Sequence, residues 1–245
     1  GLLLAVVGWL LGVPIGAALG LAGKRRAAFH ITSSLANHGF TMGGFVCFML
    51  LGEKGLGLSF IFTAYFMPFI FLVVFPYADS ARRGGADFAR IAREFIRNPR
   101  NMPLYAIMVS LLLHALDVPR PAVSFPLGAL IAVSMSVYYF TLGMTFRPGE
   151  IRSAMRENAC VALLKFAVVP ALAALVLGTL PLDPVVRAVI QVQAFMPAAV
   201  YSVITAVLYD LDAPFASGVF VVNTLLFLAV VLPVIFLLRS AIIPS

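Results

Sequence analysis

The stretch Gln191–Pro214, QVQAFMPAAVYSVITAVLYDLDAP, is long enough to cross a lipid bilayer, yet it carries a proline at its centre. A spanning helix needs about 20 apolar residues. Proline has no N–H and clashes with the preceding turn, so the helix must break at Pro197. Hydrocarbon cannot satisfy the freed backbone groups, so such a break lies inside protein or beside a water-filled cavity. We therefore predict two half-helices, at about Arg187–Met196 and Ala198–Tyr209, with Pro197 opening the second.

The polar residues of this stretch also gather on one side. Gln193, Tyr201 and Thr205 lie four or eight residues from Pro197, and this spacing puts them near one helical face. A broken membrane helix with a polar face is typical of a transport site.

The composition is that of a membrane protein. Of 245 residues, 62% are hydrophobic and 11% are charged, and the mean hydropathy is +1.05. The net charge of +7 does not indicate nucleic acid, because the basic residues lie in short runs between apolar spans, where they suit the lipid surface. Two cysteines, both within predicted spans, imply no disulfide framework. The chain opens on Gly1 inside an apolar run, and its first methionine is Met42, so we expect a missing start.

Apolar runs separated by Gly, Pro and charges predict eight membrane spans, and the charges orient them. The spans lie at about 1–22, 28–51, 57–77, 102–116, 123–146, 157–180, 186–209 and 213–238. In alternate connecting segments, twelve Lys and Arg residues lie on one side and four on the other. The positive-inside rule puts the twelve in the cytoplasm and both chain ends on the non-cytoplasmic side. The long connection 78–101 contains a short basic amphipathic pattern, which predicts either an interfacial helix or a solvated connector.

The second span carries a similar interruption. It reads HITSSLANHGFTMGGFVCFMLLGEKG, with Asn37, Gly39, Gly43 and Gly44 near its middle, and these residues weaken a helix. Thirteen residues separate Gly39 from the turn at Gly52, as thirteen separate Pro197 from Asp210. The span after each turn is predicted to end in a proline, at Pro76 and Pro233. The two copies have opposite orientations, and paired interrupted segments in inverted halves indicate a transporter binding site.

Four segments resemble the auxin efflux carrier family, of the bacterial type, within the bile acid/sodium symporter superfamily. They are Ala36–Gly57 (ANHGFTMGGFVCFMLLGEKGLG), Ala194–Asp212 (AFMPAAVYSVITAVLYDLD), Asn98–Leu113 (NPRNMPLYAIMVSLLL) and Leu142–Phe146 (LGMTF). The resemblance implies an all-α membrane protein of the bacterial inner membrane, with an inverted repeat of five plus five helices. In that fold the fourth and ninth helices are broken and cross, while scaffold helices pair the subunits into homodimers.

Mapped onto this chain, the resemblance makes span two the fourth helix and span seven the ninth, so about eight of ten helices are present. Residues 1–77 then form the transport helices of the first repeat, and 78–101 form the cytoplasmic connector. Residues 102–146 form scaffold helices, and 147–245 the transport helices of the second repeat. The chain departs from the family at Gly44, where proline is usual, and at Tyr201, where asparagine is common.

The ends of the half-helices predict a site for a small organic anion, such as a carboxylate. Positive ends near Gly43 and Ala198 would face the anion, while carbonyls at the opposing ends would accept a cation. Asn37 and Gln193 would bind substrate or ion, or only satisfy the broken backbone. Tyr201 would bind a carboxylate or pack as a core aromatic. The predicted binding set is Asn37, Gly39, Thr41, Gly43, Gly44, Gln193, Pro197, Ala198 and Tyr201.

Three charged residues are candidates for coupling or gating. Lys165 lies about 13 Å into its span at helical rise, and a lysine at that depth is functional unless its stem reaches back to the cytoplasmic face. Asp210 and Asp212 lie at the turn after the second broken helix. They would form a solvated turn, or else a gate or proton-coupling group.

These patterns favour a secondary carrier that works by alternating access, without metal or nucleotide cofactor, coupled to H⁺ or Na⁺. A sodium-coupled bile-acid-type symporter is the first alternative, with Gln191, Gln193 and Asn223 as its available ligands. A non-transporting membrane sensor is the second. An intramembrane enzyme is not expected, because the chain has no HExxH, GxSxG or aspartate-rich motif.

Overall fold

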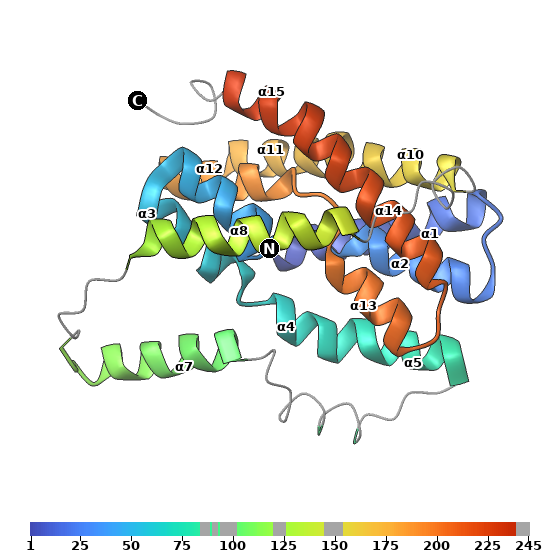
Figure 1. Cartoon of the computed structure of the whole chain (residues 1–245), viewed down its shortest axis with the longest axis horizontal. Helices are drawn as coiled ribbons and strands as arrows, with labels where there is room; N and C mark the ends of the chain where they lie inside the picture. The colour runs from blue at the N-terminus through green and yellow to red at the C-terminus, as the bar shows by residue number, and fades with distance from the viewer. Residues whose placement is uncertain (84–88, 90–92, 94–101, 120–125, 145–153, 239–245) are drawn as a thin grey trace.

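The computed structural model describes residues 1–83, 89, 93, 102–119, 126–144 and 154–238 (Figure 1). Within these residues the regular structure is helical, apart from one isolated β-bridge. The helical stretches Phe40–Arg82, Met155–Thr179 and Ala213–Leu237 are each long and apolar enough to cross a bilayer, and Leu2–Ala18 is a shorter apolar helix. The prediction of an all-α membrane protein is confirmed.

The first half of the chain forms three of the predicted spans. A left-handed backbone at Gly52, with φ of 64°, divides α3 at the predicted turn and so separates span two from span three. The elements are α1 (Leu2–Ala18), α2 (Gly23–Ser34), the π-helix η1 (Phe40–Gly44), α3 (Phe45–Thr63), α4 (Phe66–Phe69), the π-helix η2 (Ile70–Val74) and α5 (Phe75–Arg83).

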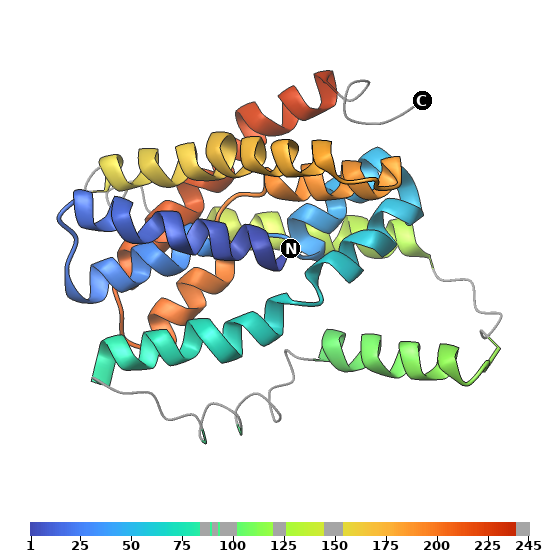
Figure 2. The ribbon, with the colours of Figure 1, turned by 180° about the vertical axis from the view of Figure 1, so that it is seen from behind.

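The second half supplies the other five spans. The elements are α7 (Met102–Ala115), α8 (Leu127–Met144), α10 (Met155–Leu163), η4 (Leu164–Val168), α11 (Val169–Thr179), α12 (Pro184–Ala194), α13 (Val200–Leu208), α14 (Ala213–Leu226), η5 (Phe227–Val231) and α15 (Leu232–Leu237). In both views α7 lies apart from the other helices (Figures 1 and 2). The amphipathic pattern of the connector and the end of the LGMTF segment lie outside the described residues.

Three of the prolines that lie inside continuing helices each follow a π-helical turn. Pro76, Pro170 and Pro233 stand two residues after the ends of η2, η4 and η5. Proline clashes with the carbonyl four residues earlier, and a wider π turn before it makes room for the ring. The predicted span ends at Pro76 and Pro233 are therefore wrong, because the helices continue to Arg83 and Leu237.

Three glycines let α1 pack closely on α2, the helix that leads into the first break. Gly8, Gly12 and Gly16 recur every four residues on one face of α1, a spacing typical of close helix contacts in membranes. A Cβ added at Gly8 would lie 2.5 Å from the Ser33 carbonyl oxygen, and one at Gly12 would lie 2.9 Å from the Ser33 Cβ. The Ser34 hydroxyl also donates to the Ala5 carbonyl oxygen at 2.8 Å.

We expect Gly8→Ala to destabilise the protein by about 1–3 kcal/mol, because the added methyl group overpacks a contact with backbone. Thermal unfolding in detergent measures the effect. Gly57→Ala is the matched control, since a Cβ at that helical position meets nothing within 4 Å, and its melting temperature should stay the same or rise. Equal melting temperatures for the two variants would contradict the close packing of α1 on α2.

Candidate functional site

The two broken helices cross where their unwound segments pair. α2 ends at Ser34 and α12 ends at Ala194, and residues 35–39 and 195–199 follow them. Ala36 and Ala198 form an antiparallel β-bridge. The Asn37 N–H donates to the Pro197 carbonyl oxygen at 2.8 Å, and the Ala199 N–H donates to the Leu35 carbonyl oxygen at 3.1 Å. Each break therefore pairs one N–H and one carbonyl group that the other break leaves without a helical partner. Backbone groups in apolar surroundings need such partners.

The second break matches the predicted half-helices, with α12 ending at Ala194 and α13 beginning at Val200. Pro197 does not open the second helix, and that prediction is wrong. Pro197 lies three residues before the start of α13, because residues 197–199 pair with the unwound segment of the first broken helix.

The first break lies earlier than its glycines indicate. The chain leaves the helix at Leu35 and re-enters it at Phe40. Gly43 and Gly44 are already helical, with their N–H groups donating to the carbonyl oxygens of Asn37 at 3.1 Å and Gly39 at 2.9 Å. The positive end of this helix therefore lies at Phe40, three residues before Gly43. The first N–H groups of this helix, which lack acceptors within it, belong to Phe40 and Thr41.

Gly43 lies at a close approach of the two broken helices. The Gln193 amide Nε2 donates to the His38 carbonyl oxygen at 3.3 Å, and Gln193 is fully buried. Its other amide atom, Oε1, is buried without a hydrogen-bond partner in the described structure. A Cβ at Gly43 would lie 2.2 Å from this oxygen and 2.8 Å from the His38 carbonyl oxygen. Glycine is needed here for space and not for conformation.

Lys165 reaches the crossing from η4. Its side chain is buried, with 3% of the residue exposed, and Nζ donates to the Ser34 carbonyl oxygen at 3.1 Å. The lysine thus lies at the carboxyl end of α2, and its side chain does not extend to solvent.

Most of the predicted binding set comes together around the bridge. The Thr41 hydroxyl lies 3.4 Å from the Asn37 Oδ1, to which it donates. Tyr201 differs, since it lies half-buried in the first turn of α13 with its ring edge-on to Phe66 at 5.6 Å between centroids. The residues at or next to the crossing are Asn37, Gly39, Thr41, Gly43, Gly44, Gln193, Pro197 and Ala198, joined by Lys165.

Sequence reasoning missed His38 as a member of this site. Its carbonyl accepts from Gln193, and its ring Nδ1 shares a hydrogen bond of 2.8 Å with the Tyr65 hydroxyl. The residue is 2% exposed. Its position between Asn37 and Gly39, inside the break, was the available signal. In the part of the chain that the structure describes, no three His, Cys, Asp or Glu residues gather as a metal site.

Asp210 and Asp212 lie away from the crossing, at the turn between α13 and α14. Asp210, with φ of 51°, accepts a hydrogen bond from Lys24 at 2.5 Å. This hydrogen bond and the charge of Lys24 lower the pKa of the Asp210 carboxyl. Asp212 accepts from the Phe215 N–H at 3.0 Å and so caps α14.

Arg25 ties this turn to the start of α10. Its Nη2 lies 2.5 Å from the Glu157 Oε1, its Nη1 lies 3.9 Å from the Asp212 Oδ2, and its guanidinium stacks over the Phe215 ring at 4.9 Å. We call Lys24, Arg25, Glu157, Asp210 and Asp212 the basic-side cluster. It joins three connecting segments that the charge count puts on one side of the membrane, which supports the assignment of the spans. Sequence reasoning missed Arg25 and Glu157.

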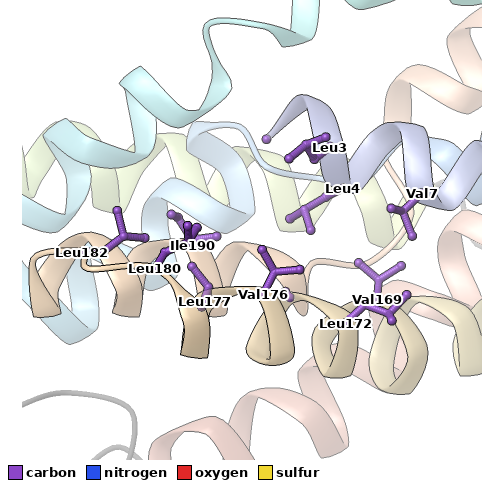
Figure 3. A pocket seen from close by; sticks show the side chains of 12 residues that line it. Leu3, Leu4, Val7, Val169, Leu172, Val176, Leu177, Leu180, Leu182 and Ile190 are labelled. Atoms are coloured by element: carbon purple, nitrogen blue, oxygen red, sulfur yellow. The ribbon is translucent and has the colours of Figure 1, made fainter.

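A separate groove of about 310 Å³ lies between α1, α11 and α12 (Figure 3). Its lining side chains are apolar, and Leu4, Val7, Leu172 and Val176 are among them. It offers no polar side chain to an anion, so the candidate site is the crossing and not this groove.

Comparison with known protein families shows where this chain belongs. The family described as "Membrane transport protein" matches residues 87–236, which is more than half of the chain. The matched region includes Lys165, the second broken helix and the turn at Asp210. No curated protein and no solved structure matches the chain.

Proposed function

This chain belongs to the membrane transport protein family, and from that premise we propose that it is a secondary carrier for a small organic anion, with the crossing as its binding site. The resemblance of its motifs to auxin efflux carriers is thereby confirmed, and the chain is a multi-pass membrane protein. The anion, the alternating access and the role of each residue below are our proposal.

The crossing of two broken helices carries this proposal. Two helices, η1 with α3 and α13, begin beside the bridge, and their first N–H groups are natural donors to a carboxylate. The buried ammonium of Lys165 adds a positive charge. Buried in the membrane, these groups favour an anion over a cation as substrate.

The rest of the molecule takes its role from this site. We place the protein in a bacterial inner membrane as a homodimer, with the basic-side cluster in the cytoplasm and both chain ends on the opposite side. Asp210 and Asp212, paired with Lys24 and Arg25, act as a gate on the cytoplasmic side. Coupling is to H⁺ or Na⁺, with no further cofactor.

A sodium-coupled organic anion symporter is a second candidate. The Gln193 Oε1 and the Asn223 Oδ1 are buried oxygens without hydrogen-bond partners in the described structure, and Na⁺ takes oxygen ligands. Transport driven by a sodium gradient would favour this candidate.

The test is uptake of radiolabelled acetate, benzoate and succinate by the protein in proteoliposomes, with sodium and pH gradients varied separately. Gln193→Leu removes the amide at the crossing. We expect uptake to fall about tenfold, since leaving a buried carbonyl unsatisfied costs about 1–3 kcal/mol.

Gln191→Leu is the matched control. Gln191 lies on the same helix and donates to the Pro170 carbonyl oxygen at 3.3 Å, a similar bond that faces α11. We expect this variant to retain uptake. Absence of uptake of every anion by the wild type, or equal uptake by both variants, would refute the crossing as the transport site.

A further inference from the structure

Lys165 brings its side-chain nitrogen to the end of a helix inside the membrane. Ser34, whose carbonyl oxygen accepts from its Nζ, is the last residue of α2. The final carbonyls of a helix have no partner within it and form the negative end of its dipole. Within the described residues, Lys165 donates to the Ser34 carbonyl oxygen. The ion pairs in this part of the chain are made by Lys24 and Arg25.

The helix ends at the crossing balance one another without this lysine. α2 and α12 end there, while η1 with α3 and α13 begin there. Each end carries roughly half an elementary charge, negative where a helix ends and positive where one begins. The four ends therefore sum to about zero, and Lys165 in its protonated form raises the total to about +1. A single carboxylate returns it to neutral.

We propose that Lys165 is a built-in substitute for a coupling cation. Its ammonium occupies the cation position at the carboxyl end of α2, and the substrate is a monocarboxylate that binds without Na⁺. A sodium ion at the same carbonyl would lie beside the ammonium and be repelled by it. This inference rests on the proposed function as an anion carrier, and it selects against the sodium-coupled candidate.

The first test uses purified protein and needs no transport. Lys165→Ala removes the atoms of propylammonium, so added propylammonium should fill the space and restore the charge. We expect it to raise the melting temperature of Lys165→Ala by about 2–4 °C. It should not raise that of the wild type or of Lys165→Met, whose side chain fills the space without charge. An equal shift in all variants, or no shift in Lys165→Ala, would overturn the inference.

Sodium binding gives an independent measurement on the same protein. We expect the wild type to show no saturable binding of radioactive ²²Na⁺ when choline is the competing cation. Saturable sodium binding would overturn the inference.

The transport arm compares benzoate with succinate in proteoliposomes that contain sodium or choline. We expect benzoate uptake to exceed succinate uptake and to be unchanged by choline. Benzoate uptake by Lys165→Met should be at least about tenfold lower than that of the wild type. Lys54→Ala is the control: it removes an exposed lysine on α3, and its benzoate uptake should equal that of the wild type. Sodium-dependent uptake, a preference for succinate, or full activity of Lys165→Met would overturn the inference. If the wild type takes up no carboxylate, the proposed function is refuted. The propylammonium and sodium-binding measurements do not depend on transport, and they would still test whether Lys165 occupies a cation position.

Discussion

Gly43→Ala will abolish carboxylate uptake and lower the melting temperature, while Gly39→Ala will leave both close to wild type. The Cβ of an alanine at position 43 would lie 2.8 Å from the His38 carbonyl oxygen, which is backbone and cannot rotate away. It would also lie 2.2 Å from the Gln193 Oε1, whose side chain is fully buried. Relief requires the two broken helices to separate. We expect the free energy of unfolding to fall by about 1–3 kcal/mol. We also expect the helix ends at the crossing to lose the arrangement that binds the carboxylate.

Gly39 provides the control, because it lies only four residues away, at the last position of the first break. Its φ of −67° is open to any residue, and a Cβ there meets nothing within 4 Å. The measurements are thermal unfolding in detergent and uptake of radiolabelled carboxylates in proteoliposomes. If Gly43→Ala matches Gly39→Ala in both, the close approach of Gln193 to η1 is not a feature of the working protein.

Arg25→Ala will destabilise the protein by about 2 kcal/mol, because it removes the common partner of two carboxylates. Arg25 donates to the Glu157 Oε1 from Nη2 at 2.5 Å and from Nε at 3.1 Å, and the Glu157 side chain is only 12% exposed. Without the guanidinium, this carboxylate stays largely buried and unpaired. Arg25→Lys should recover only part of the loss, since an ammonium does not reproduce the guanidinium fork.

Lys24→Ala is the comparison for this change, because the two residues are neighbours at the start of α2. The Lys24 and Asp210 side chains are 54% and 67% exposed, and solvent screens such a pair. We expect no measurable change in the melting temperature of Lys24→Ala. Equal melting temperatures for Lys24→Ala and Arg25→Ala would show that Glu157 does not depend on Arg25.

The existence of both breaks could be predicted from the sequence, but only one was located well. Pro197 fixes the second break to within a few residues, because its missing N–H acts on a defined turn. Gly43 and Gly44 only weaken a helix, and the first break lies at residues 35–39 instead. Pro76 and Pro233 were predicted to end their spans, but the helices continue past them. A π-helical turn before each proline makes room for its ring.

The contacts that define the site join residues far apart in the chain, so local patterns could not reveal them. Lys165 was correctly singled out as a charge inside a span, but its acceptor lies 131 residues away. Arg25 and Glu157 are 132 residues apart, and neither stands out in a charge count that treats all loop residues alike. The proximity of Gln193 to Gly43 likewise depends on how the two broken helices cross.

The β-bridge between Ala36 and Ala198 has a mechanical consequence. Main-chain hydrogen bonds fasten the two broken helices at their unwound segments, so a displacement of one along the membrane normal carries the other with it. Side-chain replacement at the remaining positions of the crossing leaves this joint in place. The ligand preference of such a protein can therefore diverge without loosening the joint between the two broken helices.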